Sequence, residues 1–275
     1  MKVLNCPCCN SNKIKKTFLS YNKVKYSICD NCNSSYQNPR VSINYKETNW
    51  ENLKDPDGNL RNLKNEKDFK IRNWYGETID YLNKNYEGKI LDIGAGLGFF
   101  LSSLNSSKWK KYALETSNDS IDYMKKNFKD INIIQGSLDD HKFEENTFDV
   151  VFFYHVFEHL ETPLSAIDEI YKLLKKNGLL IIGTPNNSSV CSLIFRKNFR
   201  LLGPEHNFII SSKQLKKILI HKNFNIIKVE YPYFKTDYFN FKNIIKMFNL
   251  NKIFFNNWKW INSKLNIVSN YTITI

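Results

Sequence analysis

Four cysteines near the N-terminus have the spacing of a metal site. Cys6 and Cys9 form one C-x-x-C pair, Cys29 and Cys32 form another, and 19 residues separate the two pairs. Two tight turns that each carry two thiolates can face each other and make the tetrahedral sulfur environment that suits zinc. Cys8 is an alternative ligand, although only Cys6 with Cys9 repeats the spacing of the second pair. A site closed by four sulfurs keeps no open position, so we predict a structural zinc.

A glycine-rich run, ILDIGAGLGFF from Ile90 to Phe100, predicts a ligand-binding turn between a strand and a helix. Glycines let a ligand approach the backbone, and the helix start offers unpaired N–H groups. A dinucleotide loop would read G-x-G-x-x-G, whereas the spacing here is G-x-G-x-G. An acidic residue before such a turn can receive the ammonium of S-adenosylmethionine, while amides hold its carboxylate. The residues expected to bind it here are Asp92, Gly94, Ala95, Gly96 and Gly98.

Two further turns complete the predicted cofactor site. Glu115 ends the next apolar run and is followed by Thr116, and a carboxylate there can accept both ribose hydroxyls. A nicotinamide cofactor would use the same position, so Glu115 alone does not discriminate. In the later turn, Leu138 would offer its N–H to an adenine, and Ser137 or Asp139 would offer a side chain. A plain surface turn is the alternative for these three residues.

Three histidines are candidates for the chemistry of the acceptor. Tyr154 and His155 end the fourth predicted strand, where open α/β sheets bind ligands. We expect Tyr154 to contact the cofactor and His155 to act as a general base or substrate contact, unless it only packs against the cofactor. His206, in the loop after the fifth strand, is the second candidate. His159 is the third, and a capping or packing role is the alternative for it.

Alternating apolar runs and amphipathic segments over residues 88–232 predict βαβ units and a parallel sheet. A further run, Asn266–Ile275, has the pattern of an edge strand. The expected strands are Lys89–Ile93, Lys111–Glu115, Ile131–Gln135, Val150–Tyr154, Leu179–Thr184 and Asn225–Val229. Helices are expected near 97–106, 118–128, 162–176 and 211–222.

These elements predict three parts. Residues 1–40 form a zinc-binding ribbon with a hairpin of Ile14–Leu19 and Val24–Ile28. Residues 41–87 form a linker and helices leading into the core, and residues 88–275 form the main domain. A helical insert is expected at 233–264, as a substrate lid, a membrane-facing amphipathic helix, a dimer contact or ordinary core packing.

The segment from Asn146 to Asn186, NTFDVVFFYHVFEHLETPLSAIDEIYKLLKKNGLLIIGTPN, resembles the class I S-adenosylmethionine-dependent methyltransferases. Together with the four-cysteine ribbon, the chain is similar to bacterial enzymes of this family that act on sugars and other small molecules. The resemblance covers about residues 70–232. It implies a Rossmann-like α/β fold, with a mostly parallel seven-stranded sheet, an antiparallel last strand and helices on both faces. Asn177-Gly178 departs from the Gly-Gly that is usual in the family.

The chain has 275 residues and a formal net charge of +13. Its lysines are scattered, so general Lys, Asn and Ile usage explains the charge as well as a polyanionic partner does. We expect a small acceptor such as a sugar or nucleotide-linked sugar, and no nucleic acid. Alternatives are an RNA or protein methyltransferase, a non-catalytic S-adenosylmethionine-binding protein and a nicotinamide oxidoreductase. The N-terminus lacks a signal-peptide pattern and no long apolar run is present, so we expect a cytoplasmic protein.

Overall fold

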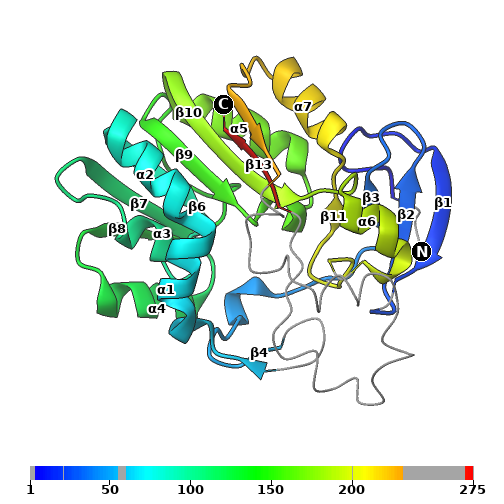
Figure 1. The fold of residues 1–275 in the computed structure, drawn as a ribbon, viewed down its shortest axis with the longest axis horizontal. Helices are drawn as coiled ribbons and strands as arrows, with labels where there is room; N and C mark the ends of the chain where they lie inside the picture. The colour runs from blue at the N-terminus through cyan, green and yellow to red at the C-terminus, as the bar shows by residue number, and fades with distance from the viewer. Residues whose placement is uncertain (1–3, 21, 55–59, 200, 232–269, 275) are drawn as a thin grey trace.

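The computed structural model describes residues 4–20, 22–54, 60–199, 201–231 and 270–274 (Figure 1). The expected insert at 233–264 lies outside these residues. The chain forms one large sheet with helices on both sides and a smaller sheet that contains the N-terminal module.

The large sheet has seven strands in the order β12-β13-β10-β9-β6-β7-β8. The five strands β10, β9, β6, β7 and β8 run parallel to one another, and β13 is antiparallel to both β10 and β12. This confirms the predicted mostly parallel sheet with an antiparallel last strand. The strand bounds are β6 Gly88–Ile93, β7 Trp109–Glu115, β8 Ile131–Gln135, β9 Phe148–Tyr154, β10 Leu174–Pro185, β12 Lys228–Glu230 and β13 Asn270–Thr274.

The position of the last strand differs from the expectation. The run Asn266–Ile275 was expected at an edge, but β13 lies inside the sheet between β10 and β12. The expected helix 162–176 also ends earlier, because β10 already begins at Leu174. Periodicity cannot place a strand in the order of a sheet, since a short apolar run fits an edge or an interior position equally well.

Helices cover both faces of the large sheet, as the resemblance implied. Alternation along β9 sends Val151 and Phe153 to the face covered by α5 and α7, and Val150 and Phe152 to the opposite face. Among the described residues, no helix combines the length and the hydropathy that crossing a bilayer requires. The helices are α1 Lys67–Lys70, α2 Gly76–Asn85, α3 Phe99–Ser102, α4 Asn118–Asn127, α5 Pro163–Leu173, α6 Val190–Phe195 and α7 Ser212–His221, with a π-helical turn at Ile71–Tyr75.

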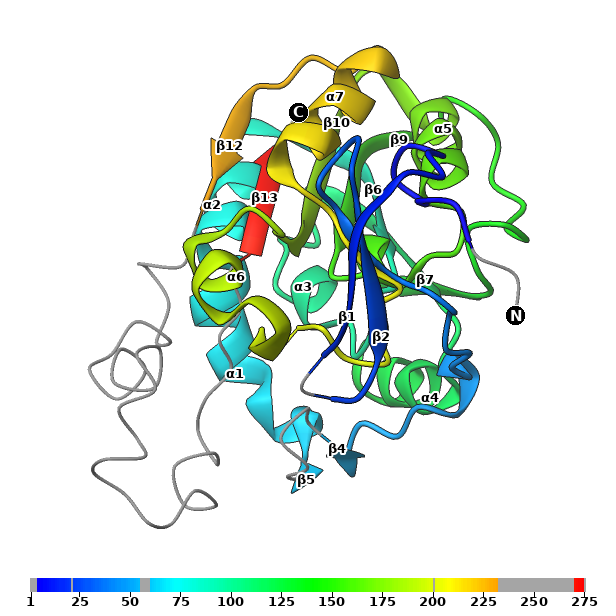
Figure 2. The same cartoon turned by 90° about the vertical axis from the view of Figure 1, so that its right-hand side faces the viewer.

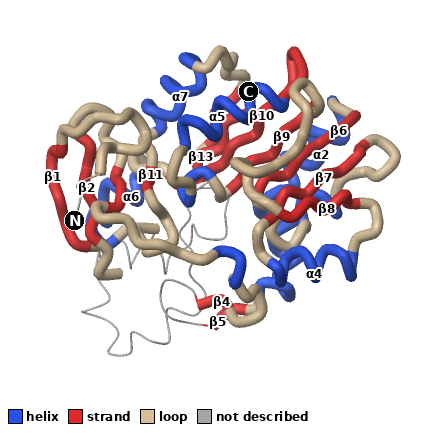
Figure 3. Tube along the Cα trace, turned by 180° about the vertical axis from the view of Figure 1, so that it is seen from behind, coloured by secondary structure: helices blue, strands red, loops and turns tan. Residues whose placement is uncertain are grey.

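The N-terminal module forms the predicted hairpin, because β1 (Ile14–Leu19) pairs antiparallel with β2 (Lys25–Cys29). A third strand, β3 (Ser35–Gln37), pairs on its far side with β11 (Phe208–Ile209) of the main domain. The module is thus joined to the main domain by a shared four-stranded sheet. It lies at the end of the molecule opposite β7 and β8 (Figures 1 and 3), and Figure 2 shows its strands β1 and β2 facing the viewer.

The segment that follows the module lies against the main domain. It carries a short hairpin of β4 (Leu53–Lys54) and β5 (Leu60–Arg61) and leads into α1. Leu63, Trp50 and Leu53 pack with Leu97 and Phe99 of the glycine-rich turn and α3. Residues 41–54 and 60–66, which we call the strap, therefore lie between the module and the predicted cofactor site.

Candidate functional site

The four predicted zinc ligands meet in one cluster. The sulfur atoms of Cys6, Cys9, Cys29 and Cys32 all lie within 4.8 Å of one another. Cys6 Sγ is 3.6 Å from Cys32 Sγ, and Cys9 Sγ is 3.5 Å from Cys29 Sγ. Sulfurs bound tetrahedrally at about 2.3 Å would be about 3.8 Å apart, so the cluster is compatible with zinc. Cys8 is buried but does not belong to it.

The glycine-rich turn has the backbone that its glycines predicted. Gly94 and Gly96 have φ angles of 69° and 53°, in the left-handed region that favours glycine. A Cβ atom added to Gly94 would lie 2.4 Å from Val156 Cγ2, whereas one added to Gly96 would meet no atom within 4 Å. The backbone of Gly96 thus borders open space, where a ligand can approach.

Asp92 lies beneath this turn at the end of β6. Its side chain is buried and makes no hydrogen bond to any described residue. Burial, followed by the negative charge of Glu115, raises the pKa of the Asp92 carboxyl well above its usual range. A buried carboxylate without a donor is suited to a cationic ligand group such as an ammonium.

Glu115 is held by the backbone on both oxygens. Oε2 accepts a hydrogen bond from the Gly96 amide at 2.7 Å, and Oε1 accepts from the amides of Thr116 at 2.7 Å and Ser117 at 2.8 Å. The carboxylate therefore keeps its remaining lone-pair capacity mainly on Oε2. These three bonds leave about one lone-pair position for a ribose hydroxyl, whereas the expected pairing with both ribose hydroxyls needs two.

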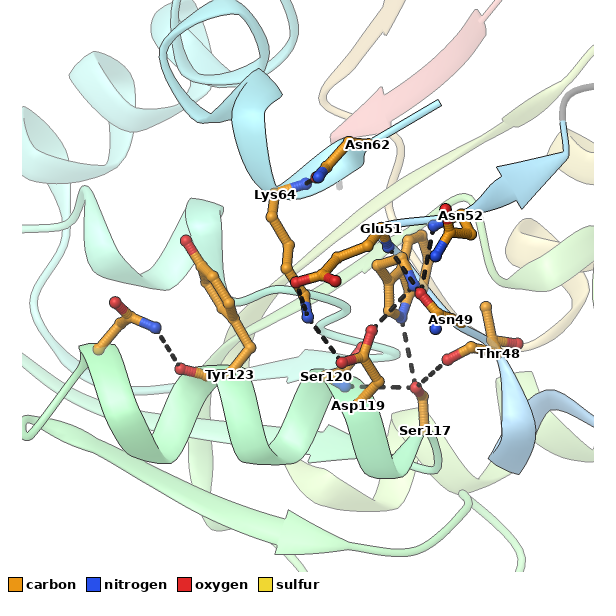
Figure 4. A network of polar contacts seen from close by, with 12 residues as sticks. Thr48, Asn49, Glu51, Asn52, Asn62, Lys64, Ser117, Asp119, Ser120 and Tyr123 are labelled. Atoms are coloured by element: carbon orange, nitrogen blue, oxygen red, sulfur yellow. Dashed lines mark hydrogen bonds and ion pairs between the residues drawn. The ribbon is translucent and has the colours of Figure 1, made fainter. Parts of the chain in front are cut away.

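The strap is anchored beside Glu115 by a polar network (Figure 4). Ser117 Oγ donates to the Thr48 carbonyl at 3.2 Å, and the Trp50 amide donates to Asp119 Oδ2 at 2.9 Å. Lys64 Nζ lies 2.7 Å from the other oxygen of Asp119. The strap therefore lies over the start of α4, next to the predicted ribose position.

The turn predicted to bind adenine lines a cavity of about 220 Å³. Ser137, Leu138 and Asp139 lie on one side of it. The Leu138 amide donates no hydrogen bond to a described residue, which leaves it available for a ring nitrogen. The Ser137 hydroxyl, by contrast, donates to Asp140 Oδ1 at 2.8 Å. The cavity also touches Val41, Ser42, Ile43 and Tyr45 of the strap and His159, Leu160, Glu161, Thr162, Ala166 and Asn207 of the main domain.

His155 follows β9 and has a strained backbone with φ of 57°. Its Nδ1 lies 3.1 Å from Glu158 Oε1, and its buried Nε2 has no partner among the described residues. The ring lies 5.6 Å from that of Trp74 and 4.7 Å from that of Tyr154. The buried Nε1 of Trp74 also lacks a hydrogen-bond partner within the described chain. Two neighbouring rings therefore each carry a buried polar atom without a partner in the described part of the chain.

Glu158 is completely buried and orients this site. Its Oε2 accepts a hydrogen bond from Thr184 Oγ1 at 2.9 Å. Burial opposes its ionisation, but the hydrogen bond and charge of His155, with smaller effects of His159 and His206, lower the pKa of Glu158 to about 2. The carboxylate is thus ionised and available to hold the His155 ring.

His159 and His206 lie together, with ring centroids 4.9 Å apart. The N-terminal module holds the loop that carries His206. Gln37 Nε2 donates to the carbonyls of Pro204 at 2.8 Å and His206 at 2.9 Å, and the Tyr26 hydroxyl lies 2.6 Å from the same His206 oxygen. The module therefore fixes one wall of the predicted acceptor site.

The structure thus brings together the predicted cofactor residues along β6, β7 and β8, and the three predicted histidines beside them. Three further residues contact these histidines and were not predicted as site residues from the sequence: Trp74, Glu158 and Tyr45. Glu158 had a signal in the sequence, since it lies three residues after His155. Trp74 and Tyr45 had none, because only tertiary packing brings them to the site.

Comparisons with known proteins agree with this arrangement. A family model described as "Methyltransferase domain" matches residues 91–182. The chain is 28% identical to a ubiquinone biosynthesis O-methyltransferase of Rickettsia typhi, over 66% of this chain and 76% of the relative. It is 27% identical to an uncharacterized protein of Methanocaldococcus jannaschii, over 58% of this chain and 77% of that protein.

Solved structures share the fold. A possible histamine N-methyltransferase from Thermotoga maritima matches with a TM-score of 0.52 and 18% identity, over 77% of this chain and 95% of its own. A methyltransferase from Aquifex aeolicus matches with a TM-score of 0.51 and 18% identity, over 80% and 97%. At these identities the likeness supports the fold alone. Together, the matching domain model, the sequence relatives and the shared fold support an S-adenosylmethionine-dependent methyltransferase with a methyltransferase domain over residues 91–182.

Proposed function

We propose that this methyltransferase acts on a hydroxyl of a small acceptor, and that the acceptor is a sugar or nucleotide-linked sugar. The observation that carries the proposal is the pair of buried, unpartnered atoms His155 Nε2 and Trp74 Nε1, in rings 5.6 Å apart. The ring nitrogen can accept the proton of an acceptor hydroxyl, and the indole N–H can donate to a neighbouring oxygen of the same acceptor.

Each group of cofactor residues would bind a different part of S-adenosylmethionine. Asp92 would receive the ammonium, and the turn of Gly94, Ala95, Gly96 and Gly98 would hold the carboxylate. Glu115 and Thr116 would contact the ribose, and Ser137, Leu138 and Asp139 the adenine. Tyr154 packs beside His155 and would border the methyl group. The bound cofactor supplies a methyl group already activated by the sulfonium charge, so alignment is the main task of the protein.

His155 would take the proton from the acceptor hydroxyl as its oxygen attacks the methyl carbon. Glu158, 3.1 Å from Nδ1, would keep that nitrogen protonated and stabilise the imidazolium that forms. His206 and His159 line the same region and are further candidates for acceptor contact or catalysis. The four-cysteine cluster would hold a structural zinc that keeps the module folded against the main domain.

The cavity beside His159 supports a small acceptor, and the charge of the whole chain is compatible with one. The cavity of about 220 Å³ lies between the strap and the main domain and extends from the turn proposed for the adenine to His159, so it suits small molecules better than a folded macromolecule. The net charge of +13 is compatible with an acceptor that carries phosphate. A reducing, cytoplasmic location fits the cysteine cluster.

A phenolic hydroxyl is the second candidate. Curated relatives are named ubiquinone biosynthesis O-methyltransferases, and Trp74 would offer an aromatic acceptor a ring to pack against. The chemistry at His155 would be the same, so the acceptor assay distinguishes the two candidates.

The test combines cofactor binding with an acceptor screen. Calorimetry with S-adenosylhomocysteine should detect binding, and labelled S-adenosylmethionine should transfer its methyl group to a nucleotide-sugar panel but not to a panel of phenols and catechols. His155→Gln should lower kcat about 10²- to 10⁴-fold and keep cofactor affinity, as expected for loss of a general base. The matched control is His221→Gln, at an exposed position at the end of α7.

Three results would contradict the proposal. Full turnover in His155→Gln would show that His155 is not the general base. Methylation of phenols alone would overturn the sugar assignment. Absence of S-adenosylhomocysteine binding would overturn the cofactor assignments.

A further inference from the structure

We propose that Glu158, His159 and His206 form a second metal site, separate from the four-cysteine cluster, that takes a divalent first-row transition metal. A carboxylate oxygen of Glu158 and one ring nitrogen of each histidine lie within 4.8 Å of one another. Glu158 and His206 are buried and His159 is half-buried. Three ligand atoms at this spacing, from two distant segments, can surround one cation.

Each imidazole is hydrogen-bonded through its Nδ1, as a histidine that binds a metal through Nε2 commonly is. His159 Nδ1 lies 2.6 Å from the Glu205 carbonyl, and His206 Nδ1 lies 2.6 Å from the Leu201 carbonyl. A carbonyl oxygen only accepts, so each Nδ1 carries the proton and each Nε2 keeps its lone pair. A metal-bound histidine characteristically donates its other N–H to such an acceptor, which fixes the ring and strengthens the ligand.

Glu158 has room for a cation on its carboxylate. His155 Nδ1 uses one lone-pair position on Oε1 and Thr184 Oγ1 uses one on Oε2, out of about four on an ionised carboxylate. In the described part of the chain, no lysine or arginine forms an ion pair with it. A fully buried carboxylate without a fixed cation is costly, and a bound metal would provide one.

The donor set selects the class of metal. Two imidazoles and one carboxylate suit zinc, iron, cobalt or nickel, whereas magnesium and calcium prefer oxygen ligands. Three protein ligands leave coordination positions open, unlike the closed set of four sulfurs. The cation would lie next to His155 and could hold two oxygens of the acceptor. Only that last role depends on the proposed function, because binding of the cation does not require an acceptor.

Cobalt titration of the full-length chain distinguishes the two sites. Cobalt bound to thiolates gives intense sulfur-to-metal charge transfer, which a site of two imidazoles and a carboxylate lacks. The wild-type chain should bind two equivalents per molecule, one with and one without this charge transfer. Elemental analysis after zinc loading should likewise find two metals per chain.

Glu158→Gln keeps the shape of the side chain, and His206→Ala removes one ligand. Each should lose only the equivalent without charge transfer, with its affinity weakened by more than about 100-fold. His221→Ala, away from the cluster, should keep both. Circular dichroism and thermal unfolding show whether each variant is folded. If one of Glu158→Gln and His206→Ala fails to fold, metal binding by the other tests the second site.

A wild-type chain that binds only the sulfur-ligated equivalent would overturn the second site. So would a second equivalent that both variants retain. Either result would leave S-adenosylhomocysteine binding and the effect of His155→Gln as they are, so the failure of this inference is distinguishable from failure of the proposed function.

Discussion

The side-chain amide of Gln37 donates a hydrogen bond to the carbonyl oxygen of His206 across 2.9 Å. Gln37 belongs to the cysteine-rich module, and His206 to the loop after β10 that borders the acceptor site. Because β3 also pairs with β11, the module supports this loop through both side chain and backbone.

Gln37→Leu should therefore impair the acceptor side of the reaction. The substitution leaves the Pro204 carbonyl without its donor, at a cost of about 1–3 kcal/mol, and leaves the Gly203 and His206 carbonyls to the Tyr26 hydroxyl alone. We expect a lower melting temperature and a reduced kcat/KM for the acceptor, measured by thermal denaturation and steady-state assay. Affinity for S-adenosylhomocysteine serves as the internal control and should stay unchanged. Unimpaired acceptor kinetics would show that the module does not support the site.

Asp92→Asn should stabilise the free protein and weaken cofactor binding. The pKa of Asp92 is raised in the folded state above the unfolded value of about 3.9. The protonated carboxyl thus contributes stability that is complete below about pH 4 and is lost as pH rises through the raised pKa. Asparagine remains neutral, so the variant should melt at a higher temperature at neutral pH.

Cofactor binding should show the opposite trend with pH. Pairing with an ammonium needs the ionised carboxylate, so affinity of the wild type for S-adenosylhomocysteine should rise as pH increases through the raised pKa of Asp92. In Asp92→Asn this dependence should disappear. Calorimetry across the pH range tests this, and an unchanged pH profile would remove Asp92 from the ammonium position.

Gly96→Ala and Gly94→Ala form a matched pair. Both place alanine in the left-handed region, at about 1–2 kcal/mol each. Only at Gly94 would the new Cβ collide with Val156, so that variant should lose more stability. At Gly96 the Cβ would enter open space, where we place the cofactor, and should reduce its affinity with little further loss of stability. Equal affinity in Gly96→Ala and the wild type would show that the ligand does not approach there.

Trp50→Ala should speed release of S-adenosylhomocysteine. The Trp50 side chain packs on the glycine-rich turn and its Nε1 donates to Ser117 Oγ at 3.3 Å, whereas its bond to Asp119 comes from the backbone amide, which alanine keeps. Loss of about 1.4 kcal/mol would raise the dissociation rate about tenfold, measured by stopped-flow fluorescence. Lys64→Met breaks the partly exposed ion pairs with Glu51 and Asp119 and the cation–π contact with Tyr123 but keeps the packing of Trp50, so it should change the rate much less. Similar rates in Trp50→Ala and wild type would argue against a covering role of the strap.

The parts that could be predicted from the sequence are those set by local spacing. The cysteine pairs, the glycine turn and Glu115 each depend on neighbours within a few residues, and most strands depend on apolar runs. Gln37, Tyr45 and Trp74 could not be assigned in this way, because their roles arise from contacts with segments far along the chain. The pairing of β3 with β11 and the interior place of β13 are likewise long-range choices, which a pattern of residues leaves open.

The interior position of β13 has a consequence for biosynthesis. β12 forms hydrogen bonds with β13 and with no other described strand, and β13 consists of residues 270–274. During translation β12 therefore leaves the ribosome before its only partner exists. Strands β6 to β10 can assemble as the chain emerges, but that edge of the sheet has to close after synthesis has passed residue 274.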